Sequence, residues 1–162
     1  MSSIRLNCVT ITTDASFCVK TKAAGYAFII SYSNSRDKVS GALVKTVPNS
    51  AQEAEVMCIA NALARFADMK VKTKLLVINI DCKFAIPKME SPTIDLPYAY
   101  LLVNALIKRV KAELGCTVEF RHVKAHSGVG DSRSRANEWC DTEAKMWRQS
   151  VQEFLKKNKR KF

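Results

Sequence analysis

Residues 75–81 read LLVINID, an apolar run that ends in an acidic residue. A run without polar alternation is typical of a strand that is covered on both faces, as in a parallel sheet. Residues 8–14 read CVTITTD, where β-branched residues again lead to a terminal acid. If these strands are parallel neighbours, Asp14 and Asp81 lie at the carboxyl edge of the sheet, where α/β proteins bind their ligands. The two segments therefore predict a parallel core with a pair of carboxylates beside it.

Two carboxylates at one edge have a distinct chemistry. Such groups repel each other and raise each other's pKa unless a cation lies between them. Ligands that offer only oxygen atoms suit Mg²⁺ or Mn²⁺. An Asp after a strand also commonly begins a turn, but this explains a single Asp better than two strands that end alike. We therefore expect a hard divalent cation at this edge.

The composition indicates one soluble globular domain with a basic surface. The 162 residues are 48% hydrophobic and 25% charged, as in ordinary globular chains. We expect a domain over residues 1–155 and a basic tail over residues 156–162, which binds nucleic acid, directs nuclear import or ends the last helix in solvent. The formal net charge of +11 favours a polyanionic partner, and nucleic acid fits better than a membrane surface.

The sequence also predicts where the chain resides. No apolar run is long enough to cross a membrane, and residues 1–7 contain no signal-peptide core. The six cysteines are scattered without a C-x-x-C motif, which indicates reduced thiols rather than a disulfide framework. We therefore expect an intracellular monomer, cytoplasmic or nuclear, that is neither secreted nor bound to a membrane.

Hydrophobic periodicity predicts the remaining elements. They are strands at 25–32, 39–47 and 117–123, and helices at 50–68, 82–86, 96–114 and from about 135 onward, with an irregular segment at 87–92. Tight connections make the first three strands antiparallel, whereas helical crossovers make the first, fourth and fifth strands parallel. The expected fold is a single α/β domain with a five-stranded mixed sheet and helices on both faces.

Two helices carry local signals of interest. Ser50 is expected to cap the helix at 50–68, with Glu53 completing a capping box. Glu55 lies close behind, where a lone acid is explained by the helix dipole. Asn137 and Asp141, four residues apart, share a face near the start of the last helix. The buried seam of that helix is expected to contain Cys140, Ala144, Trp147, Val151 and Phe154.

Short motifs follow one another along these elements. They are TDAS at 13–16, GYA at 25–27, AE at 54–55, the acid Asp81, VKAHSG at 123–128 and NEWCD at 137–141. Together they resemble ribonuclease H of type 1, the family that cuts the RNA strand of RNA/DNA hybrids. The resemblance covers about residues 6–147, and the order of the motifs makes it far more specific than any one of them.

The resemblance implies an endoribonuclease that leaves a 5′-phosphate and a 3′-hydroxyl. Its carboxylates would hold two Mg²⁺ ions, for which Mn²⁺ substitutes, and would be Asp14, Glu55, Asp81 and Asp141. By analogy Asp14 would bridge both ions, and Asp141 would serve the ion that activates water. Glu55 and Asp81 would serve the ion at the leaving oxygen. His126 would assist proton movement or product release.

The resemblance also implies substrate contacts. Gln52 would read RNA 2′-hydroxyls and Asn137 would touch a phosphate, and we expect Ser50 and Lys124 to contact the substrate as well. The polar residue that usually precedes Gln52 is here Ala51, and residues 87–98 contain no Trp-rich basic helix. The grip on the hybrid would then come from the basic tail or from Lys20, Lys22, Lys108, Arg109 and Lys111.

Three other interpretations remain open. One is a DNA nuclease of related fold, such as a junction resolvase or exonuclease, against which His126 and the motif at 137–141 argue. Another is a nucleic-acid-binding module without catalysis, which does not explain four acids at matching places. The third is a zinc site, for which the ligand types suit but the spacing is poor. Its ligands would be Cys116, His122, His126 and Cys140.

Overall fold

The computed structural model describes residues 5–123 and 132–159. Its elements, in chain order, are β1 (Leu6–Phe17), β2 (Ala24–Tyr32), β3 (Ser35–Ala42), α1 (Ala51–Met69), β4 (Thr73–Ile80), α2 (Ala85–Glu90), α3 (Tyr98–Leu114), β5 (Thr117–His122) and α4 (Ser132–Lys159). None of the described helices is long and apolar enough to cross a membrane.

The five strands form one mixed sheet in the order β3-β2-β1-β4-β5. β1 pairs antiparallel with β2 and parallel with β4, and β5 extends the parallel part. This confirms the fold class that the sequence predicts. The register between β1 and β4 pairs Thr12 with Asn79. Asp14 and Asp81 each follow two residues later, so the parallel register brings both acids to the same level of the sheet.

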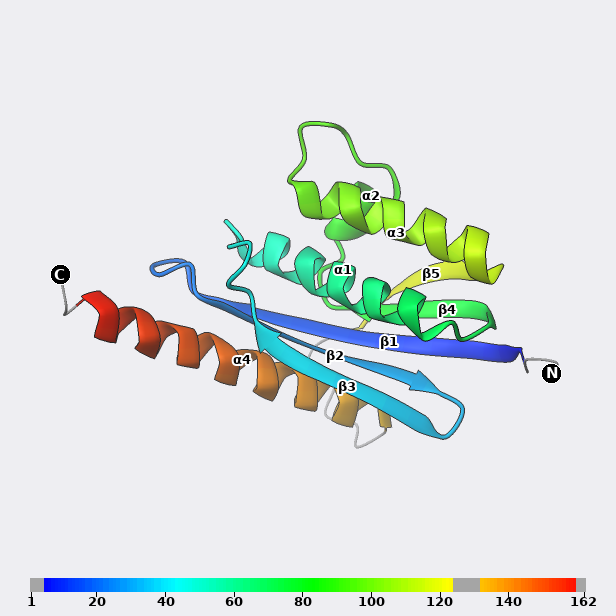
Figure 1. Ribbon diagram of the computed structural model, residues 1–162, viewed down its shortest axis with the longest axis horizontal. Coiled ribbons are helices and arrows are strands. Elements are labelled where there is room, and N and C mark those ends of the chain that lie inside the picture. Colours follow the sequence, from blue (N-terminus) through cyan, green and yellow to red (C-terminus); the bar gives the residue numbers. More distant parts are fainter. Residues whose placement is uncertain (1–4, 124–131, 160–162) are drawn as a thin grey trace.

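Helices cover both faces of the sheet (Figure 1). α1 packs on β1 and β2 with α3 against it, whereas α4 crosses β1, β2 and β3 on the other face. The main core fills the α1 side and includes Ile11, Phe28, Leu63, Phe66 and Ile78, all nearly inaccessible to solvent. The absence of a side chain at Gly25 lets α4 approach closely, because a Cβ there would lie 2.2 Å from the carbonyl oxygen of Ala144.

The third strand differs from its expected position. We predicted it at 39–47, after a loop at 33–37, but β3 spans Ser35–Ala42. The chain reverses in a two-residue turn, since Tyr32 pairs directly with Ser35. Ser33 supplies the positive φ, 53°, that such hairpin turns require. The turn contains no glycine, so the usual sequence signal for a tight hairpin was missing.

The helix after β4 is also displaced. We predicted a helical turn at 82–86 and an irregular segment at 87–92, but α2 spans Ala85–Glu90 and contains Pro87. Pro87 lies in the first turn, where a backbone N–H has no intrahelical acceptor and proline is therefore tolerated.

The last helix begins earlier and buries less than expected. α4 starts at Ser132 rather than near residue 135. Cys140 and Ala144 are buried as predicted, but Phe154 is 64% exposed, so its place in the buried seam was wrong. The C-terminal end of α4 runs past the strands, as Figure 1 shows, so the sheet does not cover this part of the helix.

Candidate active site

Three carboxylates from separate elements meet at the carboxyl edge of β1 and β4. Asp14 comes from β1, which does not end at this acid as we predicted but continues to Phe17 in its pairing with β2. Glu55 comes from the second turn of α1 and Asp81 from the residue after β4. Each offers an oxygen atom, and these atoms all lie within 4.8 Å of one another. The structure thus brings together three of the four acids that the sequence predicts as metal ligands.

Glu55 is placed by the way α1 begins. Ser50 caps the helix, and its hydroxyl accepts a hydrogen bond from the Glu53 N–H at 3.0 Å. The Glu53 carboxylate accepts from the N–H of Asn49, one residue before the cap. Glu55 then points to the sheet, where one oxygen accepts from the Ala15 N–H at 2.7 Å. The predicted cap is therefore confirmed, and by fixing where α1 begins it determines which way Glu55 points.

The second oxygen of Glu55 lacks a partner. Glu55 is 7% exposed, and its Oε2 is buried without a hydrogen bond among the described residues. A buried carboxylate oxygen without a donor is costly, because water no longer solvates it. The oxygen is therefore available to a ligand that enters the cluster.

The electrostatics of the cluster favour a cation. Burial raises the pKa of Asp14 to about 7, and the charges of Asp81 and Asp141 push in the same direction. Burial and both neighbouring aspartates also raise the pKa of Glu55 well above its ordinary value. The pKa of Asp81 is raised by burial, partly against the opposing influence of His122. Three acids that resist ionisation together form an oxygen-only donor set, which fits a hard divalent cation.

Asp141 lies beside this cluster rather than within it. Its charge raises the pKa of both Asp14 and Asp81, which places it within electrostatic range. Its carboxylate forms an ion pair with Lys145, one turn further along α4, at 3.0 Å. In this structure the partner of the Asp141 carboxylate is therefore the Lys145 ammonium and not the acidic cluster.

The remaining predicted site residues have different outcomes. Asn137 is half-buried on the first part of α4, on the element that carries Asp141. The hydroxyl of Ser50 serves as the cap of α1. Lys124 and His126 lie outside the described residues, so their roles stay predictions.

Two residues acquire neighbours that the sequence did not indicate. His122 was considered only as a zinc ligand, yet its Nε2 lies 3.0 Å from the backbone oxygen of Asp81. Gln52 contacts Tyr100, Lys88 and Cys82. Such pairings join residues far apart in the chain and leave no local signal.

Among the described residues, the metal-competent cluster does not include Cys116, His122 or Cys140, which removes support for the zinc site.

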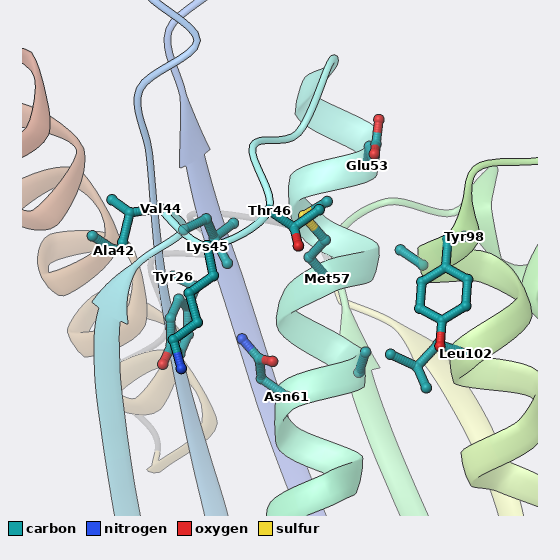
Figure 2. Close-up of a pocket in the computed structure, with 13 residues that line it drawn as sticks. Tyr26, Ala42, Val44, Lys45, Thr46, Glu53, Met57, Asn61, Tyr98 and Leu102 are labelled. Carbon is teal, nitrogen blue, oxygen red and sulfur yellow. The ribbon is translucent and has the colours of Figure 1, made fainter.

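A separate cavity of about 500 Å³ lies on another flank of α1. Its lining includes Glu53, Met57 and Asn61 of α1, and Figure 2 shows Ala42, Val44 and Lys45 on one side of this helix and Tyr98 and Leu102 of α3 on the other. None of the three clustered carboxylates lines this cavity. We therefore place the candidate active site at the carboxylate cluster on the sheet edge and not in this cavity.

Comparison with known proteins gives a family match. The model of the RNase H family matches residues 7–149, which is most of the chain. No curated protein matches the sequence.

Solved structures agree in fold at low identity. RNase H1 from the halophilic archaeon Halobacterium salinarum NRC-1 has a TM-score of 0.65 at 13% identity, covering 89% of this chain and 99% of its own. The N-terminal RNase H domain of rv2228c from Mycobacterium tuberculosis, solved as a fusion with maltose binding protein, has a TM-score of 0.61 at 15% identity, covering 85% and 96%. LC11-RNase H1, isolated from compost by a metagenomic approach and solved in complex with an RNA/DNA hybrid, has a TM-score of 0.61 at 14% identity, covering 85% and 97%.

Proposed function

Because the chain belongs to the RNase H family, we propose that it is an endoribonuclease that hydrolyses the RNA strand of RNA/DNA hybrids. The observation that carries this proposal is the cluster of Asp14, Glu55 and Asp81 at the edge of the parallel strands. The net charge of +11 supports a polyanionic substrate, and the related LC11 enzyme was solved with an RNA/DNA hybrid.

The proposed chemistry requires divalent metal. Mg²⁺ ions held by the clustered carboxylates, or Mn²⁺ in their place, would activate a water and stabilise the leaving 3′ oxygen, so that cleavage leaves a 5′-phosphate. Asp14, Glu55 and Asp81 would hold the metal at the cluster, and Asp141 would contribute a further carboxylate from α4.

The residues around the cluster have supporting roles in this proposal. Asp141 forms an ion pair with Lys145 through one carboxylate oxygen, and in this proposal a metal ion would replace or share that partner. Asn137 would then hold a phosphate near the scissile bond, and His126 would move a proton or assist product release. Gln52 would contact the RNA strand at the start of α1.

A cleavage assay on four substrates of one sequence tests the proposal. RNA/DNA hybrid, duplex DNA, junction DNA and double-stranded RNA are incubated with the protein and Mg²⁺. Cleavage of the hybrid alone is expected, with new 5′-phosphate ends and complete loss in EDTA. Preferential cleavage of junction or duplex DNA would replace this proposal with a DNA nuclease. Binding without cleavage of any substrate would support the non-catalytic module.

A further inference from the structure

The side chain of Gln52 is held by three groups from three other segments. Its Oε1 accepts hydrogen bonds from the Tyr100 hydroxyl at 2.6 Å and from the Lys88 ammonium at 3.1 Å. Its Nε2 lies 3.6 Å from the Cys82 sulfur, directly after Asp81. The amide therefore ties the start of α1 to the end of β4, to α2 and to α3.

The partners determine which way the amide faces. A lysine ammonium only donates, so the group that faces Lys88 is the amide oxygen. The Tyr100 hydroxyl is a donor as well, because burial raises the pKa of Tyr100 to about 12 and keeps it protonated. Both donors thus use the oxygen of Gln52. Among the described residues, the amide nitrogen contacts only the Cys82 sulfur, which is a weak acceptor, so its N–H groups remain available to a ligand.

Tyr100 is the rigid member of this network. It is 3% exposed and packs in the main core on the first turn of α3. α3 is in turn joined to α2, since Asn104 donates to the backbone oxygens of Met89 and Glu90. Lys88 is exposed and held by a longer contact. Tyr100 is therefore the donor that fixes the amide before any ligand arrives.

We propose that Tyr100 is a positioning residue for substrate recognition, which holds Gln52 so that its amide N–H groups donate to a 2′-hydroxyl oxygen of the RNA strand. This inference rests on the proposed function, because it assumes that a hybrid binds across this edge. A 2′-hydroxyl accepts as well as donates hydrogen bonds, and its presence distinguishes RNA from DNA. A side chain that is already fixed loses less conformational entropy when the hybrid binds.

Tyr100→Phe is the direct test, because it removes the hydroxyl and keeps the ring in the core. The matched control is Tyr98→Phe on the same helix, where Tyr98 is 73% exposed and lines the cavity of Figure 2. The substrates are hybrids of one sequence that each carry a single 2′-deoxy residue at a different RNA position. The measured quantities are kcat and KM for every enzyme and substrate pair, with thermal unfolding of each variant.

The parent and Tyr98→Phe are expected to cleave one of these hybrids, the one with its 2′-deoxy residue at the position that Gln52 contacts, less efficiently than the all-RNA hybrid. Tyr100→Phe should raise KM for the all-RNA strand about 2- to 12-fold, the value of one hydrogen bond, with little change in kcat. It should also be insensitive to the 2′-deoxy substitution at that position. Gln52→Ala should behave in the same way, and the double variant should add no further loss, because the two side chains act as a unit.

The outcomes separate this inference from the proposed function. A parent that cleaves no hybrid refutes the proposed function. A parent that cleaves hybrid while Tyr100→Phe keeps the full 2′-deoxy penalty refutes the inference alone. If Tyr100→Phe loses the same factor of kcat/KM on every substrate, the Tyr100 hydroxyl has only a structural role or Gln52 contacts base edges. Either result would overturn the inference. If Tyr100→Phe does not fold, Gln52→Ala takes its place in the test, and a full 2′-deoxy penalty in that variant counts against the inference.

Discussion

Asp14 is the residue on which the acidic cluster depends. Its carboxylate and that of Glu55 both accept a hydrogen bond from the Ala15 N–H, and the charges of Asp81 and Asp141 both raise its pKa. We expect Asp14→Asn to reduce hybrid cleavage by about a hundredfold or more, because an amide oxygen cannot neutralise bound metal. Initial rates at saturating substrate and Mg²⁺ measure the effect. Asp68→Asn, an exposed acid at the far end of the same domain, is the control and should keep the parental rate.

The raised pKa of Asp14 also predicts how the metal-free protein responds to pH. The folded-state pKa is about 7, against an ordinary value of 3.8, so the folded protein binds this proton more tightly than the unfolded chain. Stability from this group is fully present below about 3.8 and is lost as the pH rises through about 7. Glu55 shifts in the same direction. We therefore expect the free energy of unfolding in EDTA to fall across this window.

Urea denaturation at a series of pH values, with EDTA and with Mg²⁺, measures this dependence. Asp14→Asn should flatten the curve in EDTA, because an amide does not titrate. Mg²⁺ should stabilise the parent more at the upper end of the window, since metal binds the ionised carboxylates. A parental curve that rises between these pH values in EDTA would contradict the assignment.

At the scale of the element, the packing of α4 on β2 places Asp141. A Cβ at Gly25 would lie 2.2 Å from the Ala144 oxygen and 2.7 Å from the Arg148 nitrogen, and both atoms belong to the helix backbone. Backbone atoms cannot rotate away, so Gly25→Ala has to push the helix off the sheet. We expect a loss of about 3 kcal/mol or more of unfolding free energy, at the upper end for overpacking.

Gly115→Ala is the matched control for this change. Gly115 has a φ of 63° but open space around its Cβ position, so alanine adds backbone strain without a clash. Its cost should be about 1 kcal/mol. Urea denaturation compares the two variants. Equal losses would mean that α4 adjusts freely and that its packing on β2 does not determine the position of Asp141.

At the scale of the whole molecule, the excess of positive charge should set the salt dependence of hybrid binding. Five charges lie between Lys156 and Lys161, and α4 carries the helix through Lys159. We propose that this run supplies non-specific affinity. Truncation after Leu155 should then flatten the plot of log affinity against log salt, by about 0.9 for each phosphate that the tail neutralises. Turnover at saturating substrate should change little.

Hybrid affinity across a salt series, for the full chain and the truncated chain, measures this slope. Replacing both Lys156 and Lys157 with Gln keeps the length of the helix and should give an intermediate slope. Identical slopes for all three proteins would show that the tail is only a solvated helix end. The grip would then have to come from elsewhere, for example from Lys108 and Lys111 on the exposed side of α3.

The sequence by itself determined which strands run parallel and which antiparallel, and the place of the acidic pair. Both results depend on short-range rules, because periodicity identifies a strand and a helical crossover makes its neighbour parallel. The same holds for the cap at Ser50, which acts over three residues and places Glu55 near the start of α1. The third strand exists as predicted, but its predicted bounds were wrong, since its turn depends on a positive φ at Ser33 without a glycine to indicate it.

Only the tertiary structure decided how the side chains meet. Burial of Phe154 depends on how far the sheet extends beneath α4, which no pattern within the helix records. The ion pair of Asp141 with Lys145 has helical spacing, but its nearness to Asp14 depends on the close approach of α4 to Gly25. The bond between Gln52 and Tyr100 joins residues 48 positions apart. Such contacts arise from the packing of whole elements, and residue type and spacing alone do not specify them.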